Sequence, residues 1–123
     1  MIWVLVALGG GAGSVLRYGV GRLVVHYLGA PSVWGTFAVN VTGSFTLGLF
    51  ITLASERFVT APELRGLIAI GLLGGYTTFS TLSLESIQLL QSGEVAKAGV
   101  SLLGNLVLGL TAAYLGVLAG KAV

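Results

Sequence analysis

An apolar segment from about Leu64 to Leu90 is interrupted by the stretch Gly74-Gly75-Tyr76-Thr77-Thr78-Phe79-Ser80-Thr81-Leu82-Ser83. Glycine costs about 1 kcal/mol relative to alanine inside a helix, and threonine hydroxyls compete for backbone hydrogen bonds. In hydrocarbon, the N–H and C=O groups that such a break frees are tolerated only where protein buries them or a wet cavity solvates them. The stretch predicts a broken membrane helix whose backbone and hydroxyls face a polar pathway. An ordinary glycine kink is the alternative.

The composition is typical of a membrane protein. The chain has 123 residues, of which 55% are hydrophobic and 8% charged, and this argues against a soluble globular domain. There is room for about four spans of roughly 20 residues each. The chain has no cysteine, which excludes disulfides and thiolate metal sites, and its net charge of +2 is too small for a nucleic-acid-binding surface.

We therefore predict an all-α membrane protein with one four-span domain over residues 1–123. The spans are expected at about residues 2–25, 33–54, 64–90 and 96–119, with the third helix broken mid-membrane. Small residues four apart let a neighbouring helix approach closely. Such pairs occur at Gly9 and Gly13 and again at Gly116 and Gly120. The charged stretch from Ser55 to Arg65 is expected to be a loop, with a helix starting at Pro62.

Polar side chains are few inside the predicted spans. Thr36 and Asn40 share a face of the second span, and Ser101 and Asn105 share a face of the fourth. A single residue of this kind most often makes a helix–helix hydrogen bond worth about 0.6 kcal/mol. Polar atoms on every span beside a broken helix favour a pathway instead, and their amide and hydroxyl donors suit a small anion.

Charged and aromatic residues within the spans are also informative. Arg17 lies deep enough to need a protein, water or anion partner, and Glu85 is the one plausible intramembrane carboxylate. Phe79 presents a ring whose edge carries the positive end of the quadrupole, which can attract an anion. Backbone carbonyls freed at Gly74 and Thr77 would suit a small cation.

Lysine and arginine are balanced between the two sides of the predicted bundle. One side holds Arg57, Arg65 and Lys121, and the other holds Arg17, Arg22 and Lys97. The positive-inside rule then gives no preferred orientation. Insertion both ways would allow an antiparallel dimer that closes on itself. The alternative is that the balance of so few charges arises by chance.

Enzymatic chemistry finds no support in the sequence. His26 is the only histidine, so a serine–histidine pair or a histidine metal site lacks partners. The glycine run from Gly9 to Gly13 is not followed by Lys-Thr and is therefore no phosphate-binding loop. We predict that the protein is not an enzyme.

Three motifs resemble those of one family. The run Gly74 to Thr81 resembles the signature of the small bacterial fluoride channels of the CrcB/Fluc family. In the same order along the chain, two further motifs are similar to that family's first and second spans: Gly11-Ala12-Gly13-Ser14-Val15-Leu16-Arg17-Tyr18 and Gly35-Thr36-Phe37-Ala38-Val39-Asn40-Val41-Thr42-Gly43-Ser44.

The resemblance implies a multi-pass channel of the bacterial plasma (inner) membrane that exports fluoride passively and relieves its toxicity. It implies a dual-topology dimer, formed by two identical chains or by pairing with a second family member, whose partners are fluoride and membrane lipid but not nucleic acid. It also implies a structural Na⁺ held by the backbone carbonyls of Gly74 and Thr77, and a structural or vestibule role for Arg17. The implied fluoride pore comprises Thr36, Asn40, Phe79, Ser80, Thr81, Ser83, Glu85, Ser101 and Asn105.

Two positions depart from the family pattern. Leu82 stands where the family usually has a second pore phenylalanine, and Ser101 stands where many members have tyrosine. Either one aromatic per chain suffices, or a different partner chain supplies the missing ring. Two other functions stay open at this point: a small dual-topology multidrug exporter, although the first span has no proton-coupling carboxylate, and an accessory membrane protein without transport activity.

Overall fold

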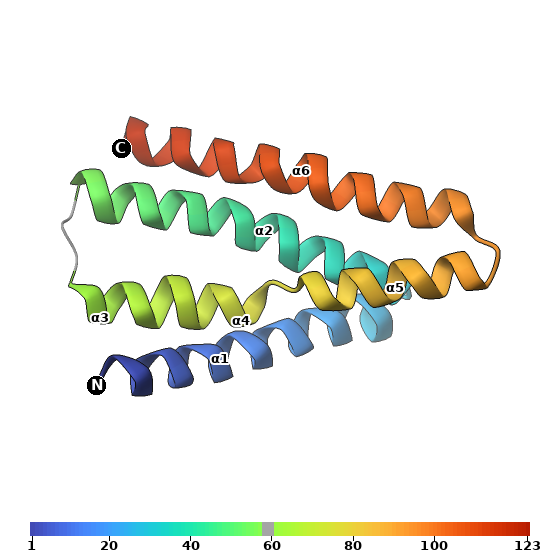
Figure 1. The fold of residues 1–123 in the computed structure, drawn as a ribbon, viewed down its shortest axis with the longest axis horizontal. Helices are drawn as coiled ribbons and strands as arrows, with labels where there is room; N and C mark the ends of the chain where they lie inside the picture. The colour runs from blue at the N-terminus through green and yellow to red at the C-terminus, as the bar shows by residue number, and fades with distance from the viewer. Residues whose placement is uncertain (58–60) are drawn as a thin grey trace.

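The computed structural model describes residues 1–57 and 61–123, with side chains for all of these but Arg57. Four antiparallel helical rods lie side by side, and the described residues contain no strand (Figure 1). The rods are long and apolar enough to cross a membrane, and they comprise Ile2–Tyr27, Ser32–Glu56, Pro62–Gln91 and Val95–Ala122. The all-α, four-span fold predicted from sequence is confirmed.

Each rod except the last combines α-helical and π-helical segments. In chain order they are α1 (Ile2–Arg22) and η1 (Leu23–Tyr27), α2 (Ser32–Thr52) and η2 (Leu53–Arg57), α3 (Pro62–Arg65), η3 (Gly66–Leu73), α4 (Gly74–Tyr76) and α5 (Phe79–Gln91), and α6 (Val95–Ala122). The helices run a few residues further at their ends than the sequence indicated. The loop expected from Ser55 to Arg65 is correspondingly shorter, and its centre, 58–60, lies outside the described residues.

Glycines decide which rods pack closely. α1 packs along η3 and α4, while α2 packs along α6. A side chain on Gly13 would meet the backbone of Leu72 and Tyr76, and one on Gly116 would meet the backbone of Phe45. The predicted small-residue pairs therefore allow backbone-to-backbone approach, as expected for membrane helices.

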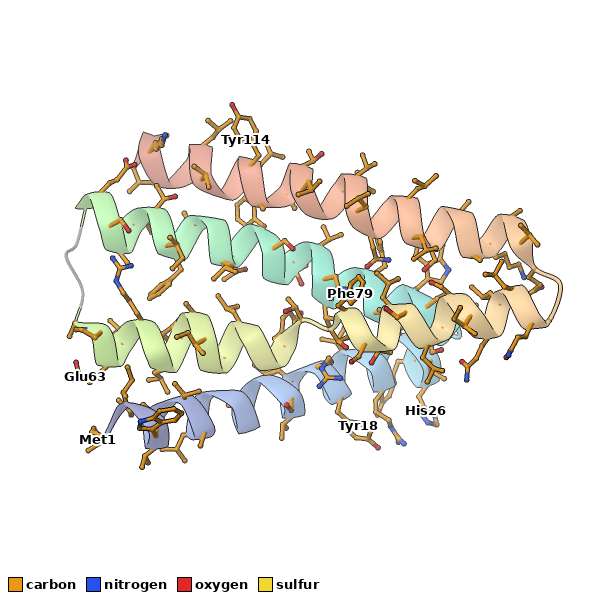
Figure 2. All side chains as sticks on the ribbon, viewed as in Figure 1. Met1, Tyr18, His26, Glu63, Phe79 and Tyr114 are labelled. Atoms are coloured by element: carbon orange, nitrogen blue, oxygen red, sulfur yellow. The ribbon has the colours of Figure 1, made fainter. Side chains whose placement is uncertain are left out.

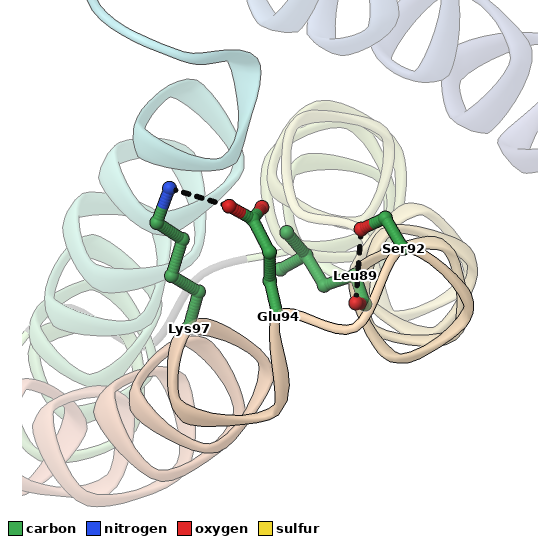
Figure 3. Close-up of polar contacts among 4 residues, drawn as sticks. All are labelled: Leu89, Ser92, Glu94 and Lys97. Carbon is green, nitrogen blue, oxygen red and sulfur yellow. Dashed lines mark hydrogen bonds and ion pairs between the residues drawn. The ribbon is translucent and has the colours of Figure 1, made fainter.

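The connections follow ordinary capping rules. Gly29 and Gly93 have φ of 66° and 80°, in the left-handed region that glycine adopts without strain. After α5, the N–H of Glu94 bonds to the Leu89 carbonyl at 2.8 Å and that of Gly93 to Leu90 at 3.1 Å, which is a Schellman ending. Figure 3 shows this turn, with the ion pair of 2.9 Å between Lys97 Nζ and Glu94 Oε1. Pro62 occupies the first turn of α3, as predicted.

The third rod is broken in its middle, which confirms the central expectation from the sequence (Figure 1). Only two residues leave the helix: Thr77 has ψ of 158°, and Thr78 has φ of −152° and ψ of 116°. The paired glycines, which were expected within the interruption, are helical in α4. A Cβ on Gly75 would lie 2.6 Å from the Gly10 carbonyl oxygen. Gly75 thus serves close packing against α1, while Gly74 is exposed, and the two threonines make the break.

Candidate functional site

Asn40 bridges the break in the third rod. Its Nδ2 donates to the Thr78 carbonyl at 3.1 Å, and its Oδ1 accepts from the Thr78 N–H at 2.8 Å. Nδ2 also donates to Oδ1 of Asn105 on α6 at 2.9 Å. The structure therefore joins α2, α6 and the broken helix through side chains that are 65 residues apart in sequence. An amide is suited to this position because it offers both a donor and an acceptor.

Thr78 caps the helix that resumes after the break. Its Oγ1 accepts from the N–H of Thr81 at 3.1 Å and contacts the Thr81 hydroxyl at 3.0 Å. This is the usual N-cap geometry, which satisfies one of the free N–H groups of a helix start. Thr78 was not among the site residues predicted from sequence, although a threonine just before a helical run is a cap signal.

The Asn40 bridge and the Thr78 cap leave two backbone carbonyls without their helical hydrogen bonds. In an unbroken helix the N–H of Thr78 would bond to the Gly74 carbonyl, and that of Thr81 to the Thr77 carbonyl. Instead these N–H groups donate to Asn40 and to the Thr78 hydroxyl. The carbonyl oxygens of Gly74 and Thr77 are therefore left without their helical partners.

Arg17 reaches the same region from α1. Its Nε donates to the Gly75 carbonyl at 3.0 Å, and its side chain is half-buried. The terminal nitrogens of the guanidinium remain for other partners, because arginine has five N–H donors in all. A membrane-buried arginine is costly unless paired, and the Gly75 carbonyl supplies such a partner beside the break.

Two cavities lie near the Asn40 bridge: Thr78 belongs to the wall of the first and Ser101 to the wall of the second, while Asn40 and Asn105 belong to neither. The first, of about 400 Å³, lies at the α1–α2 side and includes Arg17, Thr36 and Thr81 in its wall. The second, of about 720 Å³, lies among α2, α5 and α6 and includes Ser101. Glu85 lines both cavities, and its Oε1 is buried without a hydrogen-bond partner among the described residues. An unpaired buried oxygen lowers stability by about 1–3 kcal/mol, so a hydrogen-bond donor placed beside it would be stabilising.

Five predicted pore residues belong to neither cavity wall: Asn40 and Asn105, which form the bridge, and Phe79, Ser80 and Ser83. Phe79 is 79% exposed at the start of α5 (Figure 2), and Ser80 beside it is also exposed. The Ser83 hydroxyl donates to the Phe79 carbonyl at 2.9 Å. The structure therefore brings together Arg17, Thr36, Asn40, Thr81, Glu85, Ser101 and Asn105, but leaves Phe79, Ser80 and Ser83 on the outside of the single chain.

The comparisons with known proteins agree with the geometry. The family described as "CrcB-like protein, Camphor Resistance (CrcB)" matches residues 4–117. Relatives named "Fluoride-specific ion channel FluC" include one from Thermus thermophilus, 51% identical over 98% of this chain and 95% of the relative. Another, from Rhizobium etli, is 43% identical over 92% of this chain and 90% of the relative. The family expected from the three motifs is thus confirmed, and this four-span membrane protein belongs to the CrcB family.

Proposed function

We propose that this chain is a fluoride-selective channel that lets fluoride leave the bacterial cell passively, across the inner membrane, and so relieves fluoride toxicity. The observation that carries the proposal is the Asn40 bridge: an amide held at a helix break, near two cavities, in an apolar bundle. The names of its relatives support fluoride as the ion. A channel of this kind moves an ion and catalyses no reaction.

The donors around the bridge suit a small, strongly hydrated anion. Both N–H groups of Asn40 Nδ2 are already donated, to Thr78 and Asn105, so Asn40 would bind the ion by exchanging one of these bonds. The remaining N–H of Asn105 and the Thr81 hydroxyl can replace hydration without presenting a full positive charge. Arg17 adds positive potential at the first cavity, where it raises the local concentration of anions. The protein therefore attracts an anion strongly at the first cavity, beside Arg17, and more weakly at the Asn40 bridge. This difference lets an ion enter and still leave.

A second copy of the chain, placed antiparallel, would complete the pore. Phe79, Ser80 and Gly74 are exposed, and the hydroxyls of Thr42 and Tyr76 meet at 3.0 Å in another exposed contact. Polar backbone is not left against lipid, so this region calls for a protein partner. The balanced charges favour an antiparallel arrangement, in which the Phe79 ring of one chain lines a pore of the pair.

The freed carbonyls of Gly74 and Thr77 fit a structural Na⁺. Carbonyl oxygens are hard donors of the kind that hold small cations at broken membrane helices. Two chains related by a two-fold axis would contribute four such oxygens. The ion would supply positive charge that balances carbonyl dipoles aimed at one point.

Fluoride efflux from liposomes tests the function. Vesicles loaded with potassium fluoride and holding the purified chain should release fluoride when valinomycin carries the balancing charge, while matched chloride-loaded vesicles should not release chloride. Release that requires a proton gradient would indicate an exporter, and no release would indicate an accessory protein. The chain alone should suffice if the dimer is homomeric. Replacing Na⁺ by a large organic cation during purification should weaken dimerisation if the carbonyls hold Na⁺.

A further inference from the structure

We infer that Phe37 lines the anion route in the second cavity and supplies there the ring edge that attracts fluoride after the Asn40 bridge; this rests on the proposed function. Phe37 precedes Asn40 by about one turn of α2 and belongs to the wall of the cavity. Ser101, whose carbonyl accepts from Asn105 Nδ2 at 2.8 Å, belongs to the same wall, so the cavity adjoins the bridge.

The other candidate aromatic positions do not reach this space. Phe79 is 79% exposed and points out of the chain, while Leu82 is buried at 6% exposure and is aliphatic. Neither belongs to the cavity wall. Of the wall residues, Trp34 and Phe37 are the aromatic ones, and Trp34 is the further of the two from Asn40 in sequence.

Two residues lie beside the Phe37 ring. Trp34 packs against it in a T-shaped arrangement, with ring centroids 5.8 Å apart and planes at 87°. On α6, Gly104 lies beside the ring, and a Cβ added there would make an ordinary van der Waals contact with Phe37 Cε2 at 3.7 Å. The Trp34 contact restricts the ring, and an electropositive edge that the ring turns to the cavity would be a lasting part of the wall.

The charges around this cavity explain why such a ring is useful. Glu85 presents a carboxylate to the cavity, and at its mouth Lys97 is already paired with Glu94 at 2.9 Å. No described cation faces Glu85 across the cavity unpaired. A ring edge attracts an anion without a formal charge, so it can draw fluoride past Glu85 without trapping it.

Replacing the ring tests the inference. Phe37→Leu should lower fluoride efflux about fivefold, which corresponds to about 1 kcal/mol, within the range of aromatic edge interactions. Phe37→Tyr keeps the ring and should retain most of the flux. Phe50→Leu is the matched control, because Phe50 is half-buried on the same helix and lines neither cavity.

The outcomes separate this inference from the proposed function. Wild-type efflux with a selective loss in Phe37→Leu, and not in Phe50→Leu, supports the role of the ring. Equal flux in wild type and Phe37→Leu, or equal losses in both leucine variants, overturns it while the channel function stands. Should Phe37→Leu not fold, Phe37→Met removes the ring with less change in shape, and the same criteria apply to it. A wild-type chain that carries no fluoride overturns both.

Discussion

Replacing Asn40 by aspartate tests how a negative charge at the bridge affects fluoride flux. The side chain keeps its shape and still accepts from the Thr78 N–H, but it loses the bonds donated at 3.1 Å to Thr78 and at 2.9 Å to Asn105. At about 0.6 kcal/mol for each membrane hydrogen bond, this costs about 1.2 kcal/mol of stability. A carboxylate about 4 Å from a passing anion adds about 4 kcal/mol of repulsion at an effective dielectric constant of about 20. The repulsion is larger than the loss of hydrogen bonding. Since about 1.4 kcal/mol of added barrier lowers a rate tenfold, the fluoride flux should fall about a thousandfold.

Asn40→Leu is the comparison that separates charge from hydrogen bonding. Leucine loses all three bonds and leaves the Thr78 N–H unpaired, so it should lower the thermal stability in detergent more than aspartate does. Aspartate should nevertheless be the more damaging variant for fluoride efflux. Size-exclusion elution and melting curves establish that both variants fold. Efflux by a folded Asn40→Asp protein within about tenfold of the wild type would refute an anion route at this bridge.

Three other substitutions probe the framework. Gly13→Ala places a Cβ against the Leu72 carbonyl and should lower stability in a thermal melting assay by about 1–3 kcal/mol. Gly11→Ala is the control and should be neutral in the same assay, because its Cβ would meet nothing within 4 Å. Thr78→Val removes the cap and should cost about 1 kcal/mol, with Thr78→Ser as the conservative control; equal melting temperatures would contradict the capping role. Leu82→Phe overfills a buried position and should destabilise the chain by about 1–3 kcal/mol without raising fluoride efflux, and a gain in flux would instead identify leucine as a defect.

Much of the fold follows from local sequence. Apolar runs long enough to cross the bilayer dictate the helices, because an unpaired peptide group in hydrocarbon is costly wherever it occurs. The small-residue pairs at Gly9 and Gly13 and at Gly116 and Gly120 indicate close approach, since only a missing side chain permits it. The weakness of the Thr77–Thr78 region as a helix is likewise a local property.

The place and purpose of the break needed the tertiary structure. The glycines looked like the interruption, but both are helical, and Gly75 packs against Gly10 of α1. Thr77 and Thr78 leave the helix because Asn40, from another span, satisfies both backbone groups of Thr78. Sequence spacing does not reveal such a partner, since the contact depends on how α2 crosses the third rod.

The sequence by itself determined the four spans, the small-residue packing faces and the existence of a helix break, because each depends on the cost of placing particular side chains and peptide groups in lipid. Only the tertiary structure decided that Asn40 and Asn105 meet at the break, that Phe37 faces a cavity, and that Phe79 points outward. Those relations depend on the relative rotation and register of whole helices, which many distant contacts fix together.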